Sequence, residues 1–297
     1  MSAGLRNATA GLAGARRAEA AADVIDLHLH TTASDGLCEP AVLVDLAWRA
    51  GIRTMSVTDH DTVAALSEVE SAAAASGISF VPGIEITAVH DGRDVHVLGY
   101  FIDREDVALA AFLEHQRADR IRRVGVMADK LADMGKPIDR QALLASRTHG
   151  RSLGRPMVAK ALVQAGHVAD AREAFDQLIG EGRPAFVPRI GPGPAEVIAI
   201  INRAGGVASL AHPGLLRRDD LIPAMVDAGL TAVEAFHSDH DSPTTEHYLA
   251  LAERRGILVS GGSDYHGERE RRREAFGTVG LPRDRFERLA ARVKGES

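Results

Sequence analysis

The chain has 297 residues, of which 45% are hydrophobic and 26% charged; its formal net charge is −6 and it has one cysteine. This length suits one large domain or one domain carrying an insertion, and the composition is ordinary for a soluble globular protein. The negative charge disfavours a protein that binds long nucleic acid through its phosphates, and a single cysteine excludes an internal disulfide, so a reducing, cytoplasmic compartment is expected. No apolar run is long enough to span a membrane, and residues 1–22, rich in Ala, Gly and Arg, are expected to form a disordered tail.

The first hundred residues alternate between strand and helix patterns. Residues 24–30 alternate strictly between apolar and polar side chains, which is typical of a half-buried strand whose Asp26, His28 and His30 share one face. Asp61 is expected to cap the helix that follows it. The further elements expected here are a helix at 39–50, a strand at 54–58, a helix at 62–76, and strands at 80–88 and 94–102 that form a hairpin.

Residues 104–194 carry little strand pattern and are expected to form a helical insertion between two strands. A long helix is predicted at 104–134, interrupted near Gly125, with further helices at 156–164 and 170–179. Because insertions of this kind usually shape a substrate pocket, we expect this segment to cap the substrate.

The alternation of helix and strand resumes after residue 194 and continues toward the C-terminus. The elements expected are helices at 195–204, 219–228 and 243–255, and strands at 206–211, 232–236 and 258–261. Strand–helix alternation implies a parallel sheet. We therefore predict an α/β barrel, built from residues 23–103 and 195–297, with its chemistry at the C-terminal ends of the strands.

Histidines and carboxylates stand at or just past the ends of the expected strands. Neutral imidazole together with carboxylate suits borderline divalent metals such as Zn, Mn and Fe(II). Nine such residues are too many for one ion, and we expect two or three divalent ions, with Mn favoured and Zn or Fe as alternatives. The nine candidate metal ligands are His28, His30, Asp35, His60, Glu85, His96, His212, Asp264 and His266.

Six short motifs resemble the PHP (polymerase and histidinol phosphatase) phosphoesterase family over residues 24–280. They are His28-x-His30…Asp35-Gly36, Thr58-Asp59-His60-Asp61, Gly83-Ile84-Glu85, His96-Val97-Leu98-Gly99, Ala211-His212-Pro213-Gly214 and Gly262-Ser263-Asp264-Tyr265-His266-Gly267. The resemblance implies a distorted seven-stranded (β/α) barrel of PHP type with a helical insertion domain at 104–194. The motif Gly154-Arg155-Pro156 looks like the branch of nucleoside 3′,5′-bisphosphate phosphatases and 5′→3′ exoribonucleases, although Met157 and Lys160 stand where many relatives have His and Arg.

The resemblance also implies how the ligands are shared among the ions. It assigns His28, His30, Glu85 and Asp264 to the first ion, Glu85, His96 and His212 to the second, and Asp35, His60 and His266 to the third. Such ions lower the pKa of bound water from 15.7 toward about 7. A metal-bridging hydroxide is therefore expected as the nucleophile, without a covalent enzyme intermediate.

Further residues are predicted to support catalysis or substrate binding. Asp59 lies next to a ligand and is expected to orient a ligand imidazole, and His237 ends a strand and is expected to protonate the leaving oxygen or contact phosphate. Guanidinium groups match the geometry of phosphate, and several arginines cluster in the insertion. Arg155 and one of Arg120 or Arg123 are predicted to be phosphate contacts.

These observations predict a metal-dependent phosphoesterase that removes the 3′-phosphate of nucleoside 3′,5′-bisphosphates, with or without 5′→3′ trimming of short RNA. Its expected partner is a small phosphorylated substrate, with no long duplex nucleic acid, membrane or obligate protein partner. Histidinol phosphate or another small phosphomonoester is the alternative substrate. An amidohydrolase fits the pattern of Asp35 and Asp264-x-His266 poorly, and a complete ligand set disfavours a non-catalytic metal-binding module.

Overall fold

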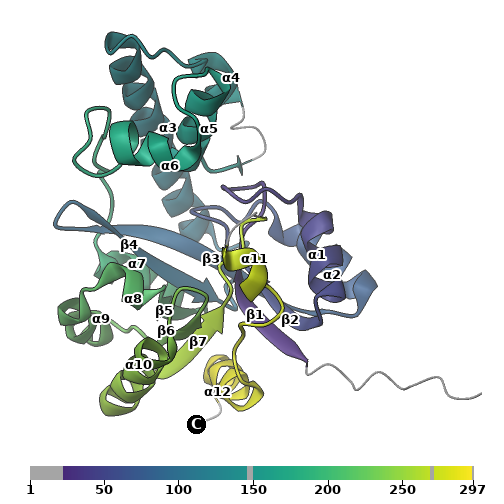
Figure 1. Ribbon diagram of the computed structural model, residues 1–297. Helices are drawn as coiled ribbons and strands as arrows, with labels where there is room; N and C mark the ends of the chain where they lie inside the picture. Colours follow the sequence, from purple (N-terminus) through teal and green to yellow (C-terminus); the bar gives the residue numbers. More distant parts are fainter. Residues whose placement is uncertain (1–22, 146–149, 268–270, 296–297) are drawn as a thin grey trace, which may run out of the picture.

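The computed structural model describes residues 23–145, 150–267 and 271–295; the tail expected at 1–22 lies outside these ranges. Its centre is one seven-stranded sheet in which the strands follow each other in chain order (Figure 1). The strands are β1 Val24–Leu29, β2 Ile52–Val57, β3 Ser79–His90, β4 Arg93–Tyr100, β5 Val207–Leu210, β6 Ala232–His237 and β7 Leu258–Gly262. All seven strands expected from the sequence are present.

The sheet curls into a nearly closed barrel. Neighbouring strands are parallel except that β4 runs antiparallel to both β3 and β5, in keeping with the expected hairpin at residues 80–102. The segment after β7 returns to β1, where Leu29 and Tyr265 form a parallel bridge and the Asp264 amide donates to the His28 carbonyl at 2.9 Å. The predicted distorted (β/α) barrel is thus confirmed, and the ends of β1 and β7 come together at one mouth.

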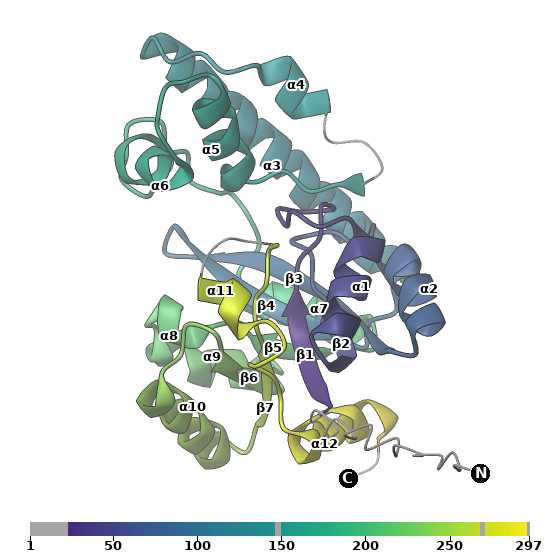
Figure 2. The same ribbon diagram turned by 45° about the vertical axis from the view of Figure 1, so that its right-hand side comes forward.

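Helices surround this barrel on its outer face (Figures 1 and 2). Helix α1 begins with Pro40, which suits the first turn of a helix, and buries Leu43, Val44 and Ala47 at the spacing of one helical face. The helices around the barrel are α1 Pro40–Arg49, α2 Leu66–Ser76, α7 Pro194–Arg203, α8 Pro213–Leu216, α9 Ile222–Asp227, α10 Ser242–Arg255, α11 Arg271–Ala275 and α12 Arg283–Lys294, with the 3₁₀ turn η3 Asp219–Leu221 before α9.

The helical segment between β4 and α7 stands on one side of the barrel as a separate lobe (Figure 2). It contains α3 Val107–Asp133, α4 Arg140–Ala145, α5 Arg155–Gln164, α6 Ala171–Ala174 and the π-helix η2 Phe175–Ile179. Leu109 and Leu113 of α3 belong to the barrel core, whereas Met127 and Leu131 belong to a second apolar core inside the lobe. Helix α3 therefore anchors the lobe to the barrel.

Two local expectations differ from the structure. Helix α3 continues through Gly125 without interruption, and a side chain at this position would approach Arg140. Asp61 does not cap the following helix, because α2 begins at Leu66 and the Asp61 backbone turns with a φ of +52°. The Asp61 carboxylate instead accepts hydrogen bonds from Arg120 of α3 and from Arg189, since a buried carboxylate needs charged partners.

Within the described residues, no helix combines the length and the apolar character needed to cross a membrane.

Candidate metal centre

The nine candidate ligands gather at the mouth of the barrel. The first seven come from β1 and the loop after it, from the loop after β2, from β3, β4 and the turn after β5; Asp264 and His266 follow β7. Four of these side chains, those of His28, His30, Glu85 and Asp264, are between 0 and 3% exposed, and the other five are half-buried. Because the C-terminal ends of parallel strands meet at one end of a barrel, residues almost 240 positions apart in the chain become neighbours.

Glu85 lies at the centre of the cluster. Its Oε2 lies 3.1 Å from His60 Nδ1, 3.3 Å from His30 Nε2 and 3.4 Å from His28 Nε2. Its Oε1 lies 2.7 Å from His96 Nδ1 and 3.2 Å from His212 Nε2. Burial raises the pKa of the Glu85 carboxyl, but the imidazoles around it outweigh this and hold that pKa well below its usual range.

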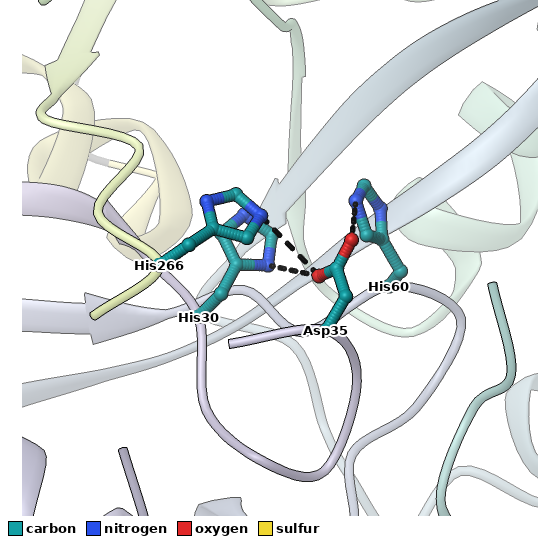
Figure 3. A group of neighbouring side chains, drawn as sticks. All are labelled: His30, Asp35, His60 and His266. Carbon is teal, nitrogen blue, oxygen red and sulfur yellow. Dashed lines mark ion pairs between the residues drawn. The ribbon is translucent and has the colours of Figure 1, made fainter. Parts of the chain in front are cut away.

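A second group of ligands surrounds Asp35. Figure 3 shows His30, His60 and His266 converging on its carboxylate. The His266 Nε2 lies 3.3 Å from Asp35 Oδ1, and the His60 Nε2 lies 3.7 Å from Oδ2. The ligand atoms of all four residues lie within 4.8 Å of one another, which is the spacing of groups that share an ion.

Asp264 connects the two groups. Its Oδ1 lies 3.4 Å from His28 Nε2, 3.2 Å from His30 Nε2 and 3.4 Å from His266 Nδ1. Burial raises the pKa of this carboxyl, but the neighbouring His28 and His266 bring it well below its ordinary value. The centre thus combines ionised carboxylates with imidazoles, and the two groups form one continuous cluster.

The structure supports metal binding by leaving ring nitrogens without well-formed hydrogen bonds. Both ring nitrogens of His30, Nδ1 of His60 and Nδ1 of His96 are buried without a hydrogen bond of good geometry, although carboxylate oxygens lie 3.2 Å from His30 Nε2 and 2.7 Å from His96 Nδ1. The ring nitrogens and the carboxylate oxygens thus face one another at 2.7–3.3 Å, which leaves their lone pairs available to a shared partner. A divalent cation is such a partner, and the mixed nitrogen and oxygen donors fit Mn, Zn or Fe(II).

The protonation of the imidazoles is compatible with this role. Burial lowers the pKa of His60 to about 3 and also lowers the pKa of His212, so both rings are neutral at pH 7 and offer a lone pair. Burial likewise opposes the charged form of His28, but the carboxylates of Glu234, Asp264 and Glu85 raise its pKa well above the ordinary value. A bound cation would displace that proton.

Asp59 and His237 lie at the edge of the cluster. Asp59 accepts hydrogen bonds from the Thr31 amide at 2.8 Å, the Thr31 hydroxyl at 2.6 Å and the Ser34 hydroxyl at 2.5 Å, so it shapes the loop that carries Asp35. His237 is 3% exposed at the end of β6, and its Nε2 lies 3.4 Å from Asp264 Oδ2.

The three predicted arginines occupy different environments. Arg120 is buried and donates to Asp61, to the Leu153 carbonyl and to the Thr87 hydroxyl. Arg123 donates to the Val187 carbonyl at 2.6 Å and stacks over a phenylalanine ring. These two side chains are engaged in the interior, between the lobe and the barrel.

Arg155, by contrast, lines an open pocket of 330 Å³ beside the cluster. Its Nη2 lies 3.3 Å from Asp94, and its side chain is 26% exposed. The pocket wall includes two candidate ligands, a phenylalanine, two leucines, two arginines and two carboxylates. They are His96, His212, Phe186, Leu215, Leu216, Arg93, Arg155, Asp94 and Glu181.

Two functional candidates escaped the sequence analysis. Glu234 on β6 is fully buried and contacts both His28 and His212. Arg189 is 7% exposed and contacts both Asp61 and Asp94. A signal for Glu234 existed, because it is a carboxylate within an otherwise apolar strand that ends in His237. Arg189 belongs to the arginine cluster of the insertion, but nothing in its proline-rich stretch distinguishes it from the other arginines there.

Several known proteins are similar to this chain in sequence or in structure. The family model described as the PHP domain matches residues 26–180. A 3′,5′-nucleoside bisphosphate phosphatase of Chromobacterium violaceum is 31% identical over 279 residues, covering 91% of this chain and 97% of that protein. A 5′-3′ exoribonuclease of Haemophilus influenzae is 37% identical over 190 residues, or 63% of this chain and 68% of that protein.

A solved structure is similar over nearly the whole chain. It is a candidate metal-dependent phosphoesterase from Bifidobacterium adolescentis, with a TM-score of 0.82 and 33% sequence identity, and the match covers 91% of this chain and 96% of the other. The similarity therefore includes both the barrel and the helical lobe.

Proposed function

Since this chain belongs to the PHP domain family and is a metal-dependent phosphoesterase, as its motifs predicted, we propose that it hydrolyses phosphate esters of nucleotides. The substrate proposed is a nucleoside 3′,5′-bisphosphate, from which the 3′-phosphate is removed, with 5′→3′ trimming of short RNA as a related activity of the same site. The observation that carries this proposal is the 330 Å³ pocket, which Arg155 and Phe186 line together with two candidate metal ligands.

The proposed metal ligands are the nine residues predicted from the sequence, holding two or three divalent ions with Mn favoured. The grouping of His30, Asp35, His60 and His266, and of His28, His30 and Glu85, supports at least two positions. When bound, such ions neutralise phosphoryl charge and lower the pKa of water toward about 7. Glu85 and Asp264 each touch imidazoles of both groups and are therefore the residues that hold the centre together.

The charge around the pocket favours an anionic substrate. Four guanidinium groups, those of Arg120, Arg123, Arg155 and Arg189, share the two carboxylates of Asp61 and Asp94, which leaves a surplus of two positive charges. Arg155 is the most exposed of the four, and its Asp94 partner is shared with two others. We propose that Arg155 binds a second phosphate of the substrate, while Arg120 and Arg123 support it from the interior.

The size and lining of the pocket favour a nucleotide over a long polymer. A volume of 330 Å³ lies at the small end of the range for ligand pockets, about 300–1,000 Å³. Phe186 and Leu215 give this pocket an apolar wall against which a nucleoside can pack. The helical lobe contributes Arg155 and Phe186, so we propose that residues 104–194 act as the substrate-capping domain.

We propose that His237 protonates the leaving oxygen or contacts phosphate. Its Nδ1 accepts a hydrogen bond from the Asp239 amide at 3.0 Å, so the neutral ring carries its proton on Nε2, which faces Asp264 and the centre. Asp59 is proposed to act indirectly, by holding the loop that presents Asp35. A cytoplasmic location and independence from an obligate protein partner complete the proposal.

The test is phosphate release and product mapping with Mn-loaded protein. The substrates are adenosine 3′,5′-bisphosphate, AMP, histidinol phosphate and a 5′-phosphorylated RNA trimer. Selective loss of the 3′-phosphate supports the proposal, and stepwise shortening of the trimer adds the exoribonuclease activity. Turnover of histidinol phosphate alone would overturn the nucleotide assignment while keeping the phosphoesterase chemistry.

A further inference from the structure

We propose that Glu234 is a positioning residue, which holds two ligands of the metal centre, His28 and His212, in the orientation and tautomer that metal binding needs. The inference rests on the proposed metal centre and adds to it a residue outside the ligand set. Glu234 lies in β6 with no exposed surface, on the barrel wall next to the cluster.

Each oxygen of the Glu234 carboxylate has its own partner. Oε1 accepts from His28 Nδ1 at 2.9 Å, and Oε2 accepts from the His212 main-chain amide at 2.7 Å. It thus holds the ring of His28 and the main chain of His212, and the rings of these two residues are stacked with centroids 5.8 Å apart. One side chain therefore sets the relative position of two ligands that are 184 residues apart in the chain.

The contact with His28 determines which of its nitrogens can bind metal. An ionised carboxylate only accepts hydrogen bonds, so the proton of a neutral His28 ring must lie on Nδ1. The lone pair then lies on Nε2, which is 3.4 Å from both Glu85 Oε2 and Asp264 Oδ1 and so faces the centre. A second carboxylate that fixes a ligand imidazole in this way commonly strengthens metal binding 10–100-fold.

The contact with His212 stabilises an uncommon backbone. His212 has φ +28° and ψ 57°, a conformation that a residue with a side chain seldom adopts without support from its surroundings. The hydrogen bond from its amide to Glu234 provides such support at the turn where β5 ends. This turn directs the His212 ring toward Glu85 Oε1, 3.2 Å away.

An amide cannot replace this carboxylate. In Glu234→Gln the side chain keeps one accepting oxygen and gains an NH₂ group that only donates. If the oxygen faces His28, the NH₂ group faces the His212 amide, and two hydrogen-bond donors then point at each other. If it faces His212, the NH₂ group drives the His28 proton onto Nε2 and blocks the nitrogen that faces the metals. Either orientation impairs the centre, although the shape of the side chain is unchanged.

The experiment compares wild type, Glu234→Gln and Asp219→Asn. Asp219 is a matched control because its two oxygens also serve two partners, His247 and Tyr248, away from the centre. Zn(II) is the probe, since it is diamagnetic: its affinity is measured by competition with a chromogenic chelator, and the tautomer of His28 by the ring ¹⁵N shifts, assigned with His28→Gln.

We expect Zn(II) affinity to fall 10–100-fold in Glu234→Gln and to remain at the wild-type value in Asp219→Asn. Wild-type affinity in Glu234→Gln would overturn the inference and leave the metal centre intact, whereas wild-type protein that binds no Zn(II) would overturn the centre itself. If Glu234→Gln does not fold, the inference is tested instead by the tautomer of His28 in the Zn-loaded wild-type protein. A His28 ring protonated at Nδ1 supports the inference, and a ring bound through Nδ1 contradicts it.

Discussion

Arg120 on α3 donates from its Nε to Oδ2 of Asp61 at 2.6 Å, with both side chains buried. Burial raises the pKa of Asp61, but Arg120 and Arg189 outweigh it and lower that pKa. Asp61 also accepts from the Thr87 amide at 2.9 Å and follows His60 directly. The lobe is thereby tied to the loop that carries a candidate metal ligand, so the proposed substrate-capping segment and the proposed metal centre are expected to move together.

Breaking this pair should destabilise the protein strongly. Removing one partner of a buried ion pair costs about 3–5 kcal/mol, because the remaining charge is left without compensation. For Arg120→Met we expect the free energy of unfolding in urea to fall by about 3 kcal/mol, toward the lower end because Arg189 still contacts Asp61. Arg122→Met is the control on the same helix, since its pair with Asp119 is more exposed and contributes about 0–1 kcal/mol. Equal losses in the two variants would contradict the prediction.

Glu85 should be indispensable for turnover. Because its two oxygens face five imidazoles, Glu85→Gln removes the charge around which the proposed ligands are arranged. We expect kcat to fall by more than about 100-fold, beyond the range for residues that only support a ligand, and metal content measured by mass spectrometry to fall with it. Truncation of His212 should also abolish turnover. Glu68→Gln, on the exposed face of α2, is the control. Near-wild-type rates in either site variant would refute the assignment.

Metal removal should lower thermal stability. The ring nitrogens of His30 are buried among the carboxylates of the proposed centre, so an ion that binds them there stabilises the folded state over the unfolded one. At a free metal concentration 100 times Kd the gain is about 2.7 kcal/mol, which shifts Tm by several degrees. Differential scanning calorimetry of chelator-treated protein, with and without added Mn(II), measures this shift. The Glu85→Gln variant should respond much less, and an equal response in that variant would place the stabilising ion elsewhere.

Arg155 should act on substrate affinity more than on the chemical step. A hydrogen bond to a charged group contributes about 1.5–3 kcal/mol, so Arg155→Met should raise KM for a nucleoside bisphosphate about 10–100-fold at nearly unchanged kcat. The change for a nucleoside monophosphate should be much smaller, because only a second phosphate reaches this guanidinium. Arg172→Met is the control, since its side chain is 89% exposed on α6. An equal rise in KM for both substrates would exclude recognition of a second phosphate by Arg155.

His237 should matter most for poor leaving groups. A general acid typically contributes about 10²–10⁴-fold, and its contribution shrinks when the leaving oxygen departs readily. We expect His237→Gln to reduce kcat about 100-fold or more with a nucleotide substrate and far less with nitrophenyl phosphate. Steady-state rates on the two substrates measure the ratio. A uniform reduction would assign His237 to phosphate binding or to the support of Asp264 instead.

The sequence by itself determined the family, the barrel and the positions of the candidate ligands. Strand patterns end at or just before His30, His60 and His212, and parallel strands bring such ends to one mouth of the barrel. The helical character of 104–194 was equally clear. The interruption expected near Gly125 was wrong, because a glycine weakens a helix only slightly and packing of α3 against both cores outweighs that cost.

Only the tertiary structure decided the contacts that tune the site. Glu234 and His28 are in contact although they are 206 residues apart in the sequence, and Asp61 and Arg120 although they are 59 residues apart. No local sequence pattern therefore predicts either pair. The same applies to the arginines: their clustering in sequence indicates a basic lobe, but Arg120 and Arg123 point into the interior while Arg155 lines the pocket. Hydrophobic periodicity determines which face of an element is buried, whereas the partner of a buried charge is determined by which elements pack together.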